Sequence, residues 1–237
     1  MRLRRRDIRL RLLRKKTSLT YRGITVPIDH DVVPIEVVEQ LADKNYEVPE
    51  IEASTVLLRP DDRVVELGSG MGVVSTLMSR AVPDGRVLTI EANPTLAPQI
   101  KQVHAANGVQ NVDRWQGIVV AGEEPQPVEF HLHKFFPEGS VRRSSGSRDI
   151  IHVDAIPWSR VIGEFKPTVL ICDIEGGETT LIPEIDTAGL RAIIVELHPG
   201  MISQTEIGQI FRKLLADGFV PRVDLQAGTV VAFERPE

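Results

Sequence analysis

The chain has few features that would place it outside a reducing, aqueous compartment. Cys172 is its only cysteine, so an intrachain disulfide is excluded, and because it lies in an apolar run we expect it to pack as a small hydrophobic side chain. No apolar run approaches the roughly 18 to 20 residues that span a bilayer. A signal-peptide hydrophobic region and internal repeats are also absent. These absences predict a cytoplasmic protein without a transmembrane segment.

The formal net charge of −5 hides an asymmetry along the chain. Residues 1–16 contain nine of the 28 arginines and lysines but one of the 33 acidic residues. Such a basic arm can contact nucleic acid, anionic lipid or an acidic partner, or it can be solvated or pack as a helix against the acidic body. We predict a basic arm over 1–16, an N-terminal helical segment over 17–60 and one ligand-binding domain over 61–237, a length suited to a single α/β sheet.

Apolar runs and helical patterns alternate along the chain, as a doubly wound sheet requires. The predicted strands cover 63–66, 86–91, 112–116, 168–174 and 192–197. The predicted helices cover 34–44, 50–58, 73–80, 94–107 and 203–217. Residues 219–225 and 229–233 flank a turn and predict a terminal hairpin. The expected fold is therefore a Rossmann-like, seven-stranded doubly wound sheet with an antiparallel final strand.

The least regular region covers 122–156. It combines two strand-like pieces, 128–133 and 149–154, with a turn-rich stretch over 137–148. Like residues 1–45, it matches no motif that identifies a ligand. We expect the contacts with a substrate to come from these segments, because connecting segments commonly carry specificity.

A glycine-rich turn follows the first predicted strand. Gly68, Gly70 and Gly72 let the backbone bend tightly and approach a ligand. Their G-x-G-x-G spacing differs from the G-x-G-x-x-G of dinucleotide sites, because position 73 is Val. The segment resembles motif I of class I S-adenosylmethionine-dependent methyltransferases. That resemblance implies that residues 68–72, including Ser69, pass the methionine part of the cofactor and that Glu66 lies near its amino group.

A second anchor for a nucleoside follows the next strand. Glu91 stands 19 residues after Gly72, close to the roughly 20 expected for a carboxylate that accepts both ribose hydroxyls. The predicted cofactor site is completed by strand-end residues, namely Ala92, Asn93, Gln116 and Asp173.

Two further motifs make the resemblance more specific. Residues 173–178 read Asp-Ile-Glu-Gly-Gly-Glu and residues 195–199 read Val-Glu-Leu-His-Pro. With Tyr46-Glu47, residues 91–94 and residues 144–147, they resemble the FkbM family of methyltransferases over roughly 45–200. The resemblance implies O-methylation of a hydroxyl on a sugar or secondary metabolite, with a small-molecule or glycan acceptor. The glycine turn departs from the family's D-x-G-A-N-x-G, so the family's Asn contact is not carried over.

Four polar residues at the ends of the fourth and fifth strands form the predicted catalytic group. They are Asp173, Glu175, Glu196 and His198. Ligands of open α/β sheets bind beyond the carboxyl ends of the strands, so these side chains should meet at the cofactor crevice. His198 is the first candidate for the base that activates the acceptor hydroxyl, since its unperturbed pKa is about 6.5, and Asp173 is the second. Asp173, Glu175 and His198 are also candidate ligands of Mg²⁺ or Mn²⁺.

Other hypotheses stay open. The basic arm could recruit a nucleic-acid methyltransferase, although no D/N-P-P-Y/F motif follows the fourth strand and the acidic body repels phosphate. Whether the protein forms an oligomer also stays open. The chain could instead be a non-catalytic Rossmann-like binding protein or an NAD-dependent oxidoreductase. The glycine spacing and the carboxylate group favour a methyltransferase over these.

Overall fold

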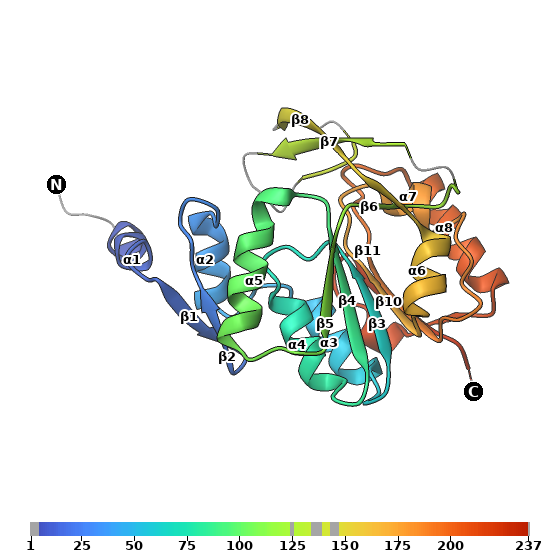
Figure 1. The fold of residues 1–237 in the computed structure, drawn as a ribbon, viewed down its shortest axis with the longest axis horizontal. Coiled ribbons are helices and arrows are strands. Elements are labelled where there is room, and N and C mark those ends of the chain that lie inside the picture. The colour runs from blue at the N-terminus through green and yellow to red at the C-terminus, as the bar shows by residue number, and fades with distance from the viewer. Residues whose placement is uncertain (1–4, 124–125, 134–138, 143–146, 237) are drawn as a thin grey trace.

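A seven-stranded sheet lies at the centre of the molecule (Figure 1), in the order β12-β13-β11-β10-β3-β4-β5. The computed structural model describes residues 5–123, 126–133, 139–142 and 147–236. The strands that run parallel are β3 (Arg63–Leu67), β4 (Arg86–Glu91), β5 (Val112–Gln116), β10 (Val169–Cys172) and β11 (Ala192–Glu196). The last strand, β13 (Val230–Glu234), is antiparallel to β11 and to the edge strand β12 (Val220–Pro221). The expected topology is confirmed.

Helices cover both faces of the sheet, because neighbouring residues of its central strands point to opposite sides. Val64 packs into one core and Val65 into the other. The first face is covered by α3 (Val48–Leu57), α4 (Val73–Ala81) and α5 (Ala97–Ala106), which follows a short 3₁₀ helix, Pro94–Leu96. The helix α2 (Ile35–Ala42) packs into the same core. The second is covered by α6 (Trp158–Phe165), α7 (Glu178–Leu181) and α8 (Gln204–Ala216) (Figure 1). Cys172 is buried among apolar side chains, as expected.

The N-terminal part differs from the prediction of a helical segment over 17–60. It contains a hairpin of β1 (Ser18–Tyr21) and β2 (Ile24–Pro27) before α2 and α3. Arg22 and Gly23 both have positive φ, at 45° and 78°, which is the geometry of a two-residue hairpin turn. Because Arg seldom occupies the first turn position, sequence patterns did not indicate the hairpin.

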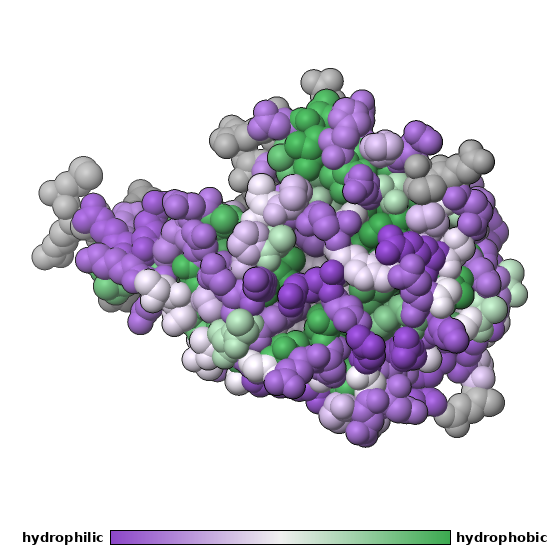
Figure 2. Space-filling view, in the orientation of Figure 1, coloured by the Kyte–Doolittle hydropathy of each residue, from purple (hydrophilic) through white to green (hydrophobic). Residues whose placement is uncertain are grey.

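The described part of the basic arm is a helix, α1 (Arg5–Leu13), which lies beside α2 (Figure 1). Leu13 is buried in the first core, and Arg9 pairs with Asp43 of the body at 2.5 Å. Most of its other described side chains face solvent, and the surface at this end is mainly hydrophilic (Figure 2). Within the described ranges, none of the helices combines the length and apolar character that crossing a bilayer requires.

The segment 122–156 forms a two-stranded addition beyond the sheet. The expected strands are present as β7 (Val128–His133) and β8 (Ser147–Val153), which pair antiparallel. A further parallel pair, β6 (Ile118–Val120) with β9 (Ala155–Pro157), was not expected from the sequence. The predicted strand over 219–225 is shorter than expected, since only Val220–Pro221 is extended and Val223–Leu225 is a 3₁₀ helix. Of the turn-rich stretch 137–148, residues 137–138 and 143–146 lie outside the described residues.

Candidate functional site

A cavity of about 480 Å³ opens at the carboxyl ends of the strands β3, β4 and β10. This volume lies within the range of small-molecule sites, about 300–1,000 Å³. One part of its wall is the glycine turn and the end of β4; another is apolar, with Leu96, Val119 and Phe130. Asp173 and Glu175 line a third part. The cavity therefore combines apolar walls with polar groups at defined positions.

The glycine turn is fixed by its contacts as well as by its backbone angles. Gly68 has φ of +86°, and a Cβ there would lie 1.8 Å from the backbone oxygen of Asp173. A Cβ on Gly70 would lie 2.9 Å from the Tyr46 hydroxyl, while one on Gly72 would meet Ile100 of α5 at the same distance. Gly68 and Gly70 line the cavity, whereas Gly72 serves helix packing.

Glu91 joins this turn to the end of β4. One carboxylate oxygen accepts from the backbone N–H groups of Ser69 at 3.0 Å and Gly70 at 3.1 Å, and the other accepts from that of Asn93 at 2.7 Å. Burial raises the pKa of Glu91 to about 7, against the effect of these donors. Because each carboxylate oxygen has two lone pairs, acceptor capacity toward the cavity is left over.

The other predicted cofactor residues take different positions. Gln116 donates to the backbone oxygens of Glu91 and Ala92 at 2.6 and 2.9 Å, and so fixes this strand end. The Glu66 carboxylate accepts from Thr89 and does not line the cavity; burial raises its pKa to about 8. The structure places these predicted cofactor residues on the wall: Gly68, Gly70, Glu91, Ala92 and Asp173. Those behind it are Glu66, Ser69, Gly72, Asn93 and Gln116.

The four predicted catalytic residues do meet, with His198 at their centre. The Nε2 atom of His198 lies 3.4 Å from Glu175, 3.6 Å from Asp173 and 4.0 Å from Glu196. Of the predicted metal ligands, Asp173 and His198 share a group with Glu196 whose ligand atoms all lie within 4.8 Å of one another. Asp173 and Glu175 face the cavity, but Glu196 and His198 stand behind them and do not line it.

Sequence reasoning missed three acidic neighbours of this group. Glu178 is fully buried and accepts from the backbone N–H of His198 at 3.1 Å, with the ring Nδ1 at 3.2 Å. Glu47 and Glu50, at the start of α3, bring carboxylate oxygens within 4.8 Å of one from Glu196. We define the acidic cluster by its members, Glu47, Glu50, Asp173, Glu175, Glu178 and Glu196. The Tyr46-Glu47 pair and the last acid of the 173–178 motif were signals that could have found Glu47 and Glu178.

The carboxylates of this cluster raise the pKa of the acid and of the base alike, whereas burial acts on the two in opposite directions. Burial alone would lower the pKa of His198, but the bond to Glu178 and the nearby carboxylates outweigh it and raise the pKa. Burial, followed by repulsion from Glu47, Glu196 and Glu50, raises the pKa of Asp173 well above its ordinary value. The raised pKa of His198 contradicts the expectation that it keeps its unperturbed value.

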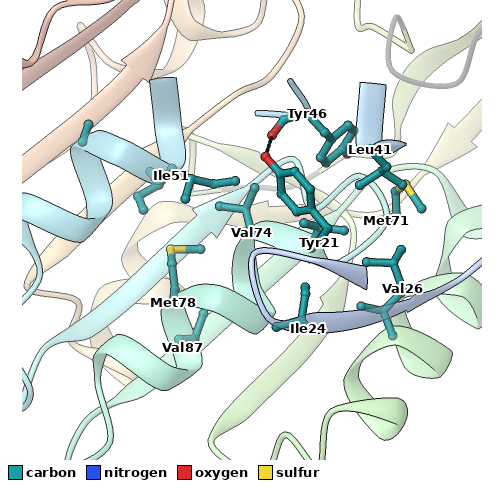
Figure 3. Close-up of a cluster of buried hydrophobic side chains, with 14 of the residues drawn as sticks. Tyr21, Ile24, Val26, Leu41, Tyr46, Ile51, Met71, Val74, Met78 and Val87 are labelled. Carbon is teal, nitrogen blue, oxygen red and sulfur yellow. Dashed lines mark hydrogen bonds between the residues drawn. The ribbon is translucent and has the colours of Figure 1, made fainter. Parts of the chain in front are cut away.

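The N-terminal hairpin holds one side of the cluster in place. Tyr21 of β1 is fully buried, and its hydroxyl donates to the backbone oxygen of Tyr46 (Figure 3). The next residue, Glu47, has φ of 45°, a left-handed conformation that is costly for a side chain with a Cβ. Such strain is maintained only where the surrounding structure enforces it, and it is frequent at functional sites.

The segment after β7 closes over the opposite side. The Ser140 hydroxyl donates to the backbone oxygen of Glu175 and accepts from the backbone N–H of Arg142 at 2.9 Å. The Arg142 guanidinium donates to Thr179 and to Glu206 of α8, both at 2.7 Å. A segment from the N-terminal part of the chain, residues 46–47, and one from its middle, residues 139–141, therefore line the same cavity.

Comparison with solved structures assigns the fold. The structure is similar to a precorrin-6y C5,15-methyltransferase from Geobacter metallireducens, with a TM-score of 0.50 and 14% sequence identity over 80% of this chain and 87% of that chain. It is also similar to Trm5b from Pyrococcus abyssi, with a TM-score of 0.50 and 11% identity over 93% and 56% of the two chains. The chain has a Rossmann-like methyltransferase fold, as the sequence predicted. No protein-family model and no curated protein sequence matches it.

Proposed function

We propose that the protein is an S-adenosylmethionine-dependent methyltransferase that transfers a methyl group to a hydroxyl of a sugar or secondary metabolite. The observation that carries the proposal is the cavity on this fold, which joins the glycine turn and Glu91 to the carboxylates Asp173 and Glu175. These groups fit the cofactor. The turn brings backbone close to the cavity without side chains, Glu91 has an acceptor site left for a ribose hydroxyl, and the apolar wall suits an adenine ring.

Within this proposal, Asp173 is the better candidate for the base. It lines the cavity, while His198 lies behind it with Nε2 3.6 Å from the Asp173 carboxylate. A base must reach the proton that it removes, so geometry favours Asp173 and makes His198 a positioning residue. Methyl transfer is an in-line displacement: the acceptor oxygen forms a bond to the methyl carbon, the carbon–sulfur bond breaks, and the acceptor proton goes to the base. The cofactor supplies the methyl group, and holding the acceptor in line contributes most.

The choice of a hydroxyl acceptor is supported by the sequence motifs that resemble the FkbM family. The two motifs supply a histidine and the four acids that contact it in the structure. These are His198 with Asp173, Glu175, Glu178 and Glu196. Carboxylates suit removal of a hydroxyl proton. The neighbour from Geobacter is by name a precorrin methyltransferase, so a small-molecule acceptor is compatible with this fold.

Calorimetry on the full chain tests the cofactor. We expect micromolar binding of S-adenosylmethionine and of its demethylated product, and no heat with NAD. Heat with NAD alone would contradict the proposal. Incubation with methyl-labelled cofactor and fractionated cell extract then tests the acceptor, because label in a small molecule or glycan supports it, whereas label lost on nuclease treatment supports a nucleic-acid methyltransferase recruited by the basic arm.

A further inference from the structure

We propose that Glu47, Glu50 and Glu196 hold a divalent metal ion that prefers oxygen ligands, such as Mg²⁺, Mn²⁺ or Ca²⁺. One carboxylate oxygen from each lies within 4.8 Å of those of the other two. Ligands on opposite sides of one ion are roughly 4 Å apart for Mg²⁺ and roughly 5 Å apart for Ca²⁺. The three side chains therefore lie at a spacing that one ion can bridge. This set differs from the ligands Asp173, Glu175 and His198 that the sequence indicates.

A buried, unpartnered oxygen is the second observation. Glu50 is 4% exposed, and its Oε2 atom has no hydrogen-bond partner. A buried carboxylate oxygen without a donor is costly, so it commonly marks an ion or a functional role. Among the described residues, neither lysine nor arginine forms an ion pair with Glu47, Glu50 or Glu196. A divalent cation would supply the missing positive charge.

The surroundings of these carboxylates fit a metal site in two more ways. The Thr229 hydroxyl donates to Glu196 at 2.9 Å and leaves its other oxygen for a ligand role, as supporting groups around metals do. Glu47 lines the cavity, which provides an entry path and open coordination positions for water or a bound oxygen. All three ligands are oxygen donors, which favours hard ions over Zn²⁺.

Direct metal binding tests the inference without any assay of activity. Full-length protein is stripped with a chelator and titrated with Mn²⁺, with free Mn²⁺ followed by electron paramagnetic resonance. We expect one Mn²⁺ per chain, displaced by Mg²⁺ or Ca²⁺, and a rise in Tm on binding. Glu50→Gln and Glu196→Gln should each weaken binding at least about tenfold. Glu52→Gln, on the exposed side of the same helix, is the matched control and should bind like the wild type.

No saturable binding at millimolar Mn²⁺, Mg²⁺ or Ca²⁺ would overturn the inference, and so would unchanged binding in both cluster variants. Thermal unfolding of the metal-free variants shows whether they fold; if Glu50→Gln does not, Glu196→Gln, which is partly exposed, decides the result. Cofactor calorimetry in chelator keeps the two proposals separate. Cofactor binding without metal binding would overturn only the metal site, and metal binding without cofactor binding would overturn only the proposed function.

Discussion

Glu91 and Glu50 are both buried carboxylates beside the same cavity, yet their surroundings are opposite. Glu91 accepts from three backbone N–H groups, so the fold itself satisfies it. Glu50 has an oxygen without a partner and lies near Glu47 and Glu196, so the fold leaves it unsatisfied. In the first arrangement fixed backbone donors fill most of the acceptor sites of the carboxylate, although burial still raises its pKa. The second is incomplete, and an added cation or bound protons must balance it.

The two ends of the cavity therefore have different roles. The glycine-turn end, residues 68–72 with Glu91, is preorganised to shape a binding surface. The acidic cluster concentrates negative charge where a reacting group or an ion would lie. The following predictions test whether these ends can be changed separately.

Gly68→Ala should give the largest effect because it disturbs both ends at once. The new Cβ would overlap the backbone oxygen of Asp173 at a φ of +86°. We expect a loss of about 3 kcal/mol or more in the free energy of unfolding, measured by urea denaturation. Gly163→Ala is the control, since it is an exposed position in α6 with open space around it, and it should stabilise by up to about 1 kcal/mol. Equal stability of the two variants would contradict the prediction.

Asp173→Asn should change catalysis at the acidic end while leaving the glycine-turn end intact. We expect kcat to fall about 100-fold or more, with cofactor Kd little changed, because a base acts mainly in the transition state. His198→Gln should cost less, since His198 does not line the cavity. Asp84→Asn, an exposed site after α4, should have no effect on the rate. If His198→Gln lost more activity than Asp173→Asn, the base would be reassigned to His198.

Glu91→Gln should weaken cofactor binding by about 1.5–3 kcal/mol, the typical range for hydrogen bonds to a charged group. The amide would also place a donor against the N–H groups of Ser69, Gly70 or Asn93, so some loss of Tm should accompany the loss of affinity. Calorimetry with S-adenosylmethionine measures the loss of affinity, and thermal unfolding measures the loss of Tm. Glu129→Gln, on the exposed side of β7, serves as control. Unchanged affinity would remove Glu91 from the cofactor site.

The raised pKa of Glu66 predicts that the free energy of unfolding depends on pH. Glu66 does not line the cavity, so this dependence concerns the fold and not the site. Burial raises its pKa to about 8, above the ordinary value of 4.5. A carboxyl with a raised folded-state pKa favours folding while it is protonated. Its contribution is complete below pH 4.5 and is lost as pH rises through about 8. Denaturation at pH 6 and pH 9 should differ by on the order of 2 kcal/mol from this group. Glu66→Gln should reduce the slope without abolishing it, because Glu91 and Asp173 also have raised pKa values. An unchanged slope would assign the dependence elsewhere.

Truncation of the arm should have the smallest effect on either end of the cavity. Deleting residues 1–9 removes the exposed ion pair of Arg9 with Asp43, which is worth about 0–1 kcal/mol. Deleting residues 1–16 also removes the buried Leu13, so Tm should fall by several degrees more. Cofactor Kd, measured by calorimetry, should stay the same in both. A large change in Kd would show that the arm supports the site.

Local patterns predicted the parts of the fold that local physics controls. The alternation of strand and helix patterns predicted the doubly wound sheet. The predicted helix over 203–217 is present as α8, which begins at a capping box of Ser203 and Glu206. The hairpin at 18–27 was missed because its turn uses Arg22 in a left-handed conformation. The pair of β6 and β9 was missed because three-residue strands carry almost no periodic signal.

The sequence by itself determined the fold class, the glycine turn, Glu91 and the meeting of Asp173, Glu175, Glu196 and His198, because parallel strands bring their carboxyl ends to one edge. Only the tertiary structure decided which of these face the cavity, and it alone added Glu47 and Glu50 from a helix more than a hundred residues away in sequence. The tertiary structure also decided which charged groups of the acidic cluster have partners. The pKa of His198 and the unpartnered oxygen of Glu50 depend on burial and on distances between segments, which no local pattern encodes.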